Sequence, residues 1–161
     1  MPLSASDFQP QDLPPDLLST APEQLFPQAR DAKAALSGLL LMAGHWDLSH
    51  QAAQDLSSRE GSYWHAIAHR IEPDSWNSGY WFRRVGRHPI FGPLHEQVAP
   101  LLIESRVEWR LKNDWDPELF LAWCDETRNR PESEKYRTAR KIQYAECELL
   151  FSWCALKLSD L

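Results

Sequence analysis

Several features that narrow the function of a protein are scarce in this sequence. Its longest uninterrupted apolar run, residues 39–43, is far shorter than the roughly 20 residues that span a bilayer. The first seven residues show neither the basic region nor the apolar core of a secretion signal. The three cysteines include no Cys-x-x-Cys pair and are too few for a disulfide framework. We therefore expect a cytoplasmic protein with buried thiols and no membrane partner.

Basic residues are also in the minority. The chain carries 17 Lys and Arg against 23 Asp and Glu, a formal net charge of −6 over 161 residues. Nucleic-acid binding requires a basic face that neutralises phosphates, so we expect no nucleic-acid partner. The hydrophobic share of 43% and the charged share of 25% are ordinary for globular chains and predict one compact domain.

Strand-like patterning is missing as well, because no run of four or more residues alternates convincingly between polar and apolar. Helical spacing of apolar residues recurs instead, while glycines and prolines interrupt residues 86–93, which we expect to form an ordered loop. The helices are predicted at residues 28–43, 49–56, 61–72, 78–85, 94–102, 117–124 and 133–158, with a break or kink at Pro100. The expected fold is all-α, a compact single-domain bundle of six to eight helices in residues 28–161.

Prolines are concentrated at the start of the chain. Six of the twelve lie within residues 1–27, which predicts an extended, proline-rich N-terminal arm. Apolar residues such as Phe8, Leu13 and Phe26 are too many for a free tail. The arm is therefore expected to lie on the body of the protein or on a partner chain, which makes a homo-oligomer one interpretation.

Histidine is absent from most of the chain, since all six histidines fall between His45 and His95. Five Arg and three acidic residues give residues 59–95 a local charge of +2, whereas the 12 basic and 20 acidic residues elsewhere give −8. A locally positive segment suits the anionic group of a small ligand or internal pairing with the acidic remainder. We take residues 45–95 as the candidate site segment.

Three side chains in this segment share one flank of a predicted helix. His65, His69 and Glu72 follow the i, i+4 and i+7 spacing of one helical face. Two imidazoles and a carboxylate arranged in this way can bind one divalent metal, with a further ligand from His50, His45, Asp74 or His88. The same residues can act as acid and base without a metal, or simply donate hydrogen bonds to neighbouring helices.

The following helix presents basic residues beside a phenol. Arg83, Arg84 and Arg87 share one side with Tyr80 and can clamp a carboxylate or phosphate, because each guanidinium offers a planar fork of donors. The alternative is that one or two of them pair with Glu72, Asp74 or acids of the C-terminal helix. The segment also contains aromatic residues suited to pocket walls. The ligand-binding candidates are Trp46, Trp76, Tyr80, Arg83, Arg84, Arg87 and His88.

The motifs of this segment resemble the signature block of a family of uncharacterised bacterial and fungal proteins. The resemblance covers the stretches GSYWHAIAHR (61–70), EPD (72–74), YWFRRVG (80–86) and HPIF (88–91), together with Asn77. It extends more weakly to Asp47 and His50. The resemblance implies that this block distinguishes the family, and it implies no activity, cofactor or catalytic residue.

Together these patterns predict a pocket in residues 45–95 that binds a small anionic or polar ligand. If the protein is an enzyme, proton transfer or hydrolysis suits the residues, with His65, His69 and Glu72 as acid, base or metal ligands and a divalent metal as cofactor. The alternative function is a non-catalytic helical interaction protein, in which the His, Arg and Glu side chains form a buried ion-pair network.

Overall fold

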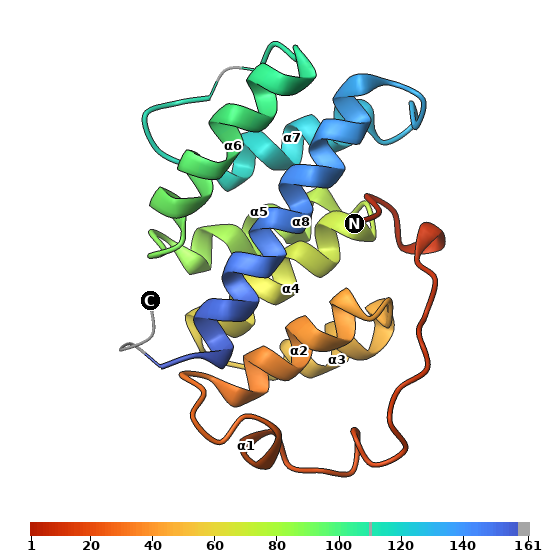
Figure 1. The fold of residues 1–161 in the computed structure, drawn as a ribbon, viewed down its shortest axis with the longest axis vertical. Coiled ribbons are helices and arrows are strands. Elements are labelled where there is room, and N and C mark those ends of the chain that lie inside the picture. Colours follow the sequence, from red (N-terminus) through yellow and green to blue (C-terminus); the bar gives the residue numbers. More distant parts are fainter. Residues whose placement is uncertain (110, 158–161) are drawn as a thin grey trace.

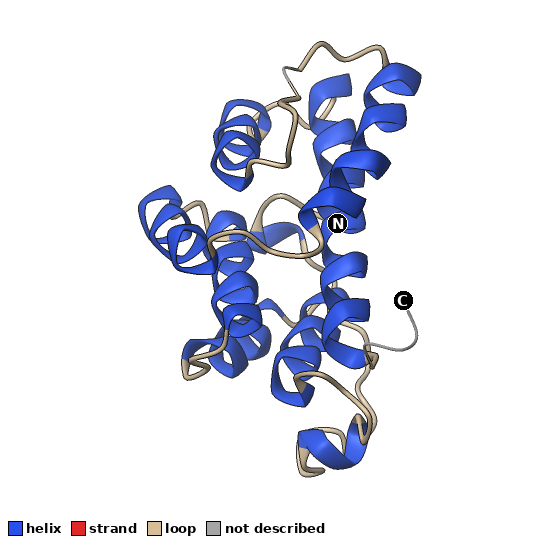
Figure 2. Ribbon diagram, turned by 90° about the vertical axis from the view of Figure 1, so that its left-hand side faces the viewer, coloured by secondary structure: helices blue, strands red, loops and turns tan. Residues whose placement is uncertain are grey.

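Helices and connecting loops make up the whole of the described chain. A computed structural model describes residues 1–109 and 111–157 and contains eight α-helices and no strand within them, as Figure 2 shows. This confirms the predicted all-α fold. The elements are η1 (Ala5–Asp7), α1 (Pro22–Leu25), α2 (Ala32–Met42), α3 (Trp46–Gln54), α4 (Arg59–Ile71), α5 (Ser75–Val85), α6 (Phe91–Ser105), α7 (Pro117–Thr127) and α8 (Glu134–Ala155).

Side-chain caps determine where several helices begin. Asp116 accepts hydrogen bonds from the backbone N–H groups of residues 118 and 119, and Pro117 occupies the first position of α7, as predicted. Ser133 caps α8 in the same way. That helix ends at Ala155, so Leu156 is exposed rather than directed to the core, and its predicted end at residue 158 lies outside the described residues.

Three predicted helix starts were wrong. Ser49 lies inside α3, where it is buried and its carbonyl accepts a hydrogen bond from the Ser37 hydroxyl. Helix α4 begins at Arg59 rather than at residue 61, with Ser58 as its cap, and α5 begins at Ser75 rather than at residue 78, with Asp74 as its cap.

The loop after α5 is shorter than predicted. Gly86 has a positive φ of 61° and ends α5 as expected, but α6 already begins at Phe91 and continues through Pro100. Pro100 lies on the exposed side of α6, where water can satisfy the carbonyl that loses its helical partner.

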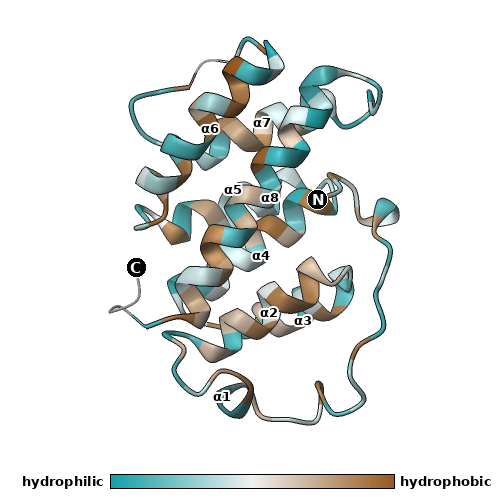
Figure 3. Ribbon diagram, in the orientation of Figure 1, coloured by the Kyte–Doolittle hydropathy of each residue, from teal (hydrophilic) through white to brown (hydrophobic). Residues whose placement is uncertain are grey.

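Helix α4 lies at the centre of the bundle, where every residue from Gly61 to Ile71 is buried. It packs against α2, α3 and α5, while the long helix α8 packs along α2, α6 and α7 (Figure 1). Gly38 allows α2 to lie close to α4, because a Cβ atom at this position would overlap the Trp64 ring. Figure 3 shows hydrophobic and hydrophilic residues interleaved along α8, as expected for a helix with one buried face.

The N-terminal arm is only partly extended and docks on its own chain. It contains η1 and the single turn of α1, and it runs along the outside of the bundle (Figure 1). Leu3 is buried, the Gln143 amide donates to the carbonyl of Pro2, and the Gln11 N–H donates to the carbonyl of Ala43. Of the two predicted docking surfaces, the arm occupies the body of the protein.

No helix in the described ranges combines the length and the apolarity that crossing a membrane requires.

Candidate metal centre

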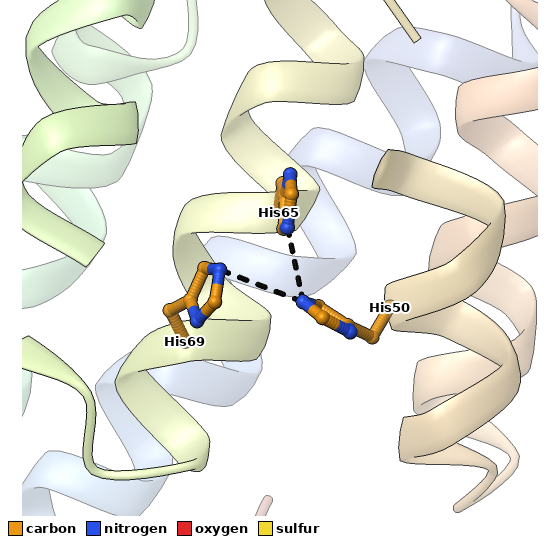
Figure 4. A group of neighbouring side chains, drawn as sticks. All are labelled: His50, His65 and His69. Atoms are coloured by element: carbon orange, nitrogen blue, oxygen red, sulfur yellow. Dashed lines mark hydrogen bonds between the residues drawn. The ribbon is translucent and has the colours of Figure 1, made fainter. Parts of the chain in front are cut away.

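Three imidazole rings from two helices meet at one point. His50 of α3 lies opposite His65 and His69, which are one turn apart on α4 (Figure 4). The Nε2 atom of His50 is 2.9 Å from Nε2 of His65 and 3.5 Å from Nε2 of His69. All three side chains offer a ligand atom, and these atoms lie within 4.8 Å of one another. The cluster can therefore hold one metal ion.

Tryptophans fix the rings of this cluster. The Trp46 ring stacks on His50 with an interplanar angle of 7° and a centroid separation of 5.4 Å. Trp46 Nε1 donates to the carbonyl of Ala68 at 3.0 Å, which ties α3 to α4 beside the cluster. On the other side, the Trp81 ring packs 4.3 Å from that of His65. Trp46, predicted as a wall of a ligand pocket, thus packs against the cluster together with Trp81.

Glu72 holds the outer nitrogen of His69. Its Oε2 atom is 3.1 Å from His69 Nδ1, and Oδ2 of Asp74 is 3.9 Å away. A carboxylate only accepts hydrogen bonds, so Nδ1 of His69 donates to it, and in the neutral ring Nε2 then presents its lone pair to the cluster. Glu72 is therefore a partner of His69, and His50 takes the place expected of Glu72 beside the two α4 imidazoles.

His69, Glu72 and Asp74 form a second cluster of possible metal ligands. Both carboxylate oxygens of Asp74 already accept hydrogen bonds, from the backbone N–H and the side-chain amide of Asn77, because Asp74 caps α5. Glu72 is exposed to solvent. The three-imidazole cluster is better enclosed, with His65 and His69 only 4% and 8% exposed, and is the stronger candidate.

Burial favours the neutral forms of His65 and His50. Desolvation, reinforced by the neighbouring His50 and His69, lowers the pKa of His65 to about 4. Desolvation and His69 also lower the pKa of His50. A neutral imidazole is the form that binds a metal.

The three rings cannot satisfy all of one another's hydrogen-bonding groups. When the neutral His69 ring donates through Nδ1, the three Nε2 atoms share at most one hydrogen, on either His50 or His65, so at least one of the two close Nε2–Nε2 contacts lacks a hydrogen of its own. His65 Nδ1 is buried and has no hydrogen-bond partner among the described residues. A cation shared by the three Nε2 lone pairs would relieve this conflict, and three imidazoles would leave a fourth zinc position open for water or substrate. With its Nε2 bound, His65 would carry a hydrogen on Nδ1 that has no acceptor among the described residues.

The predicted arginine clamp does not assemble. Arg83 pairs with Glu118 of α7 at 3.0 Å, and Arg87 pairs with Asp114 at 2.9 Å, so neither shares a target with Arg84. Their partners come from α7 and the segment before it, rather than from Glu72, Asp74 or α8. Arg84 lies over the Trp81 ring, with Cζ 5.0 Å from its centroid, and donates to the Tyr80 hydroxyl at 3.3 Å.

Two other predicted ligand residues lie away from an enclosed pocket. Trp76 is 76% exposed and stacks on Tyr80 at the surface, so it does not wall a cavity. His88 is buried, and its Nε2 atom is 3.6 Å from Oε1 of Glu60, which also accepts a hydrogen bond from Trp153. His88 is the main cause that lowers the pKa of Glu60 to about 2. His88 is therefore a buried residue that links the loop before α6 to Glu60 of α4.

Sequence reasoning missed a second buried polar group. Arg70 of α4 pairs with Glu146 of α8, and both side chains are 0% exposed. Gln143 accepts a hydrogen bond from Arg70 Nε, and the Tyr63 hydroxyl donates to Glu146 at 2.8 Å. The sequence contains a sign of this pair. Glu146 lies one helical turn from both Ile142 and Leu150, on the buried face of α8.

The three-imidazole cluster and the buried pair are thus both built on α4, within the block that resembles the bacterial and fungal family. No protein-family model, curated protein or solved structure matches this chain. That resemblance stays a prediction.

Proposed function

We propose that the protein is a metal-dependent hydrolase that acts on a small anionic substrate. The observation that supports it is the convergence of the Nε2 atoms of His50, His65 and His69 on one point. Imidazole ligands suit zinc, copper, iron and nickel, and a three-histidine set with an open fourth position is typical of catalytic zinc. Zinc is therefore the proposed cofactor.

When bound, zinc would supply a nucleophile, because it lowers the pKa of a bound water to about 7. The residues of the chain prepare that chemistry. Glu72 orients His69 through Nδ1 and raises its basicity as a ligand, a contribution that typically changes metal affinity 10–100-fold. Trp46 and Trp81 hold His50 and His65 and exclude water from two sides of the cluster.

Metal analysis tests this function directly. Protein purified without chelators or an affinity tag is expected to contain about one zinc per chain and to hydrolyse p-nitrophenyl esters of carboxylic or phosphoric acids. His65→Ala removes a ligand and is expected to lose both the metal and the hydrolysis. His95→Ala is the matched control, because His95 lies outside the cluster and contacts the carbonyl of Lys112. A chain that does not bind zinc stoichiometrically is not this enzyme.

Arg84 supports an anionic substrate. Its two neighbours Arg83 and Arg87 are neutralised by carboxylates, whereas within the described residues no carboxylate lies at ion-pair distance from Arg84. The Trp81 ring packs against both the Arg84 guanidinium and the His65 ring. A substrate whose reacting group binds the metal can thus place a carboxylate or phosphate near Arg84 across this ring.

Two metal-binding probes that differ by one carboxylate test this role. Arg84→Gln is expected to weaken binding of succinic monohydroxamate to the zinc protein about tenfold, since a charge-assisted hydrogen bond contributes about 1.5–3 kcal/mol. Binding of acetohydroxamate, which lacks the carboxylate, should not change. Arg83→Gln is the control and should affect neither probe; calorimetric titration of the wild type and both variants with each probe measures the six affinities. If Arg84→Gln and Arg83→Gln behave alike, Arg84 does not bind the substrate.

The second candidate function is a non-catalytic helical interaction protein, and the buried Arg70–Glu146 pair is the observation that favours it. In that case the histidines only join α3 to α4, and the chain binds no stoichiometric zinc. For either function we propose a cytoplasmic setting, which the three buried free cysteines support, because a reducing compartment preserves thiols.

A further inference from the structure

A groove lies between α6 and α8, on helices that contribute nothing to the three-imidazole cluster. Its volume is about 720 Å³. Apolar side chains form much of its surface, with Pro100 and Leu101 from α6, Ala145 from α8, and Met1 from the arm. Tyr144 closes one side and is 44% exposed. The groove is thus an accessible apolar surface on a protein whose core is otherwise well enclosed.

The polar part of the groove is positive. Arg137, Arg140 and Lys141 line it together with the terminal residue Met1, and none of the described side chains that line it is acidic. Flanking carboxylates partly compensate, because Arg137 pairs with Glu134 and Lys141 Nζ lies 3.9 Å from Glu104.

Arg140 keeps most of its hydrogen-bonding capacity. Its Nε donates to the carbonyl of Met1, and in the described part of the chain no carboxylate pairs with its guanidinium. On a chain of net charge −6, this combination of cations favours an anionic occupant.

We propose that the α6–α8 groove binds a small amphiphilic carboxylate, with its apolar chain over Pro100, Leu101 and Ala145 and its carboxylate at Arg140 and Lys141. The volume falls within the range of small-molecule sites, roughly 300–1,000 Å³. A stable protein interface needs about 20–30 residues a side, far more than line this groove. Arginine is suited to the carboxylate, because its planar fork of donors matches two oxygens.

Titration with two amphiphiles of the same chain length tests the charge preference. Decanoate is expected to bind at least tenfold more tightly than decyltrimethylammonium, which has the same apolar chain and the opposite charge, as measured by calorimetry below the micelle concentration. Higher salt should weaken decanoate binding, since the cations are exposed. Equal affinities for the two amphiphiles, or no decanoate binding, would overturn the proposal.

Single substitutions on α8 locate the site. Arg140→Gln is expected to lower decanoate affinity about tenfold, consistent with loss of a charge-assisted hydrogen bond. Because this change also removes a contact to Met1, Lys141→Gln is the second variant, with an expected loss of about threefold from an exposed charge. Lys135→Gln is the matched control, since Lys135 pairs with Glu126 outside the groove. A decanoate affinity unchanged in both groove variants contradicts the assignment.

The His65→Ala variant separates this groove from the proposed metal site. A carboxylate can also bind a metal, so decanoate held at the three-imidazole cluster would be lost together with the zinc. Wild-type affinity in His65→Ala supports the groove, whereas loss of binding in that variant overturns it.

Discussion

Replacing Glu146 with Ala is expected to lower the free energy of unfolding by about 3–5 kcal/mol, because the substitution leaves the Arg70 guanidinium charged and without its partner in the core. Both side chains of the pair are 0% exposed. The Tyr63 hydroxyl also loses its acceptor. Burial and the Glu146 carboxylate raise the pKa of Tyr63, so this hydroxyl keeps its proton in the native protein. Urea unfolding followed by tryptophan fluorescence measures the loss.

Two further variants show that the loss comes from an uncompensated buried charge. Glu118→Ala removes the partner of Arg83 at the surface, where both side chains are more than half exposed, and is expected to change stability by less than about 1 kcal/mol. Replacing both buried residues, as Arg70→Met with Glu146→Leu, should recover most of the stability, because no charge then remains in the core. A Glu146→Ala protein within about 1 kcal/mol of wild type would contradict this account.

The predictable part of the fold was the part that depends on local sequence. Apolar spacing identifies most helices, and the predicted starts of α7 and α8 agree with the structure to within one residue, since Pro directly after Asp116 favours the first position of a helix and Ser133 is a good cap. Where several residues with good capping side chains lie close together, local preference does not determine which of them begins the helix. Ser49 is a good cap by itself, yet packing against Ser37 places it inside α3.

The candidate site likewise has a part that local sequence predicts and a part that depends on how the helices pack. The i, i+4 spacing of His65 and His69 lies within one helix and was predictable. Which distant histidine joins them depends on how α3 packs on α4, and no local pattern separates His50 from His45 or His88. The pairing of Arg83 with Glu118 likewise depends on where α7 lies against α5.

Saturating zinc is expected to stabilise the protein by about 4 kcal/mol when the free metal is 1,000-fold above its dissociation constant, because a ligand that binds only the native state shifts the unfolding equilibrium by mass action. The native chain holds one ligand atom from each of the three histidines within 4.8 Å, whereas an unfolded chain separates His50 from His65 by a flexible segment. For a chain of about this size, the stabilisation corresponds to a rise in Tm of about 8–16 °C. Differential scanning calorimetry with and without zinc measures it.

The control is the comparison of His65→Ala with His95→Ala. The first removes a ring of the cluster and is expected to abolish the response to zinc, while the second leaves the cluster intact and should keep it. Acid should also suppress the response, since protons compete with the metal for the imidazole lone pairs as pH falls. If zinc raises Tm equally in both variants, the metal binds elsewhere, and the convergence of His50, His65 and His69 only fastens α3 to α4.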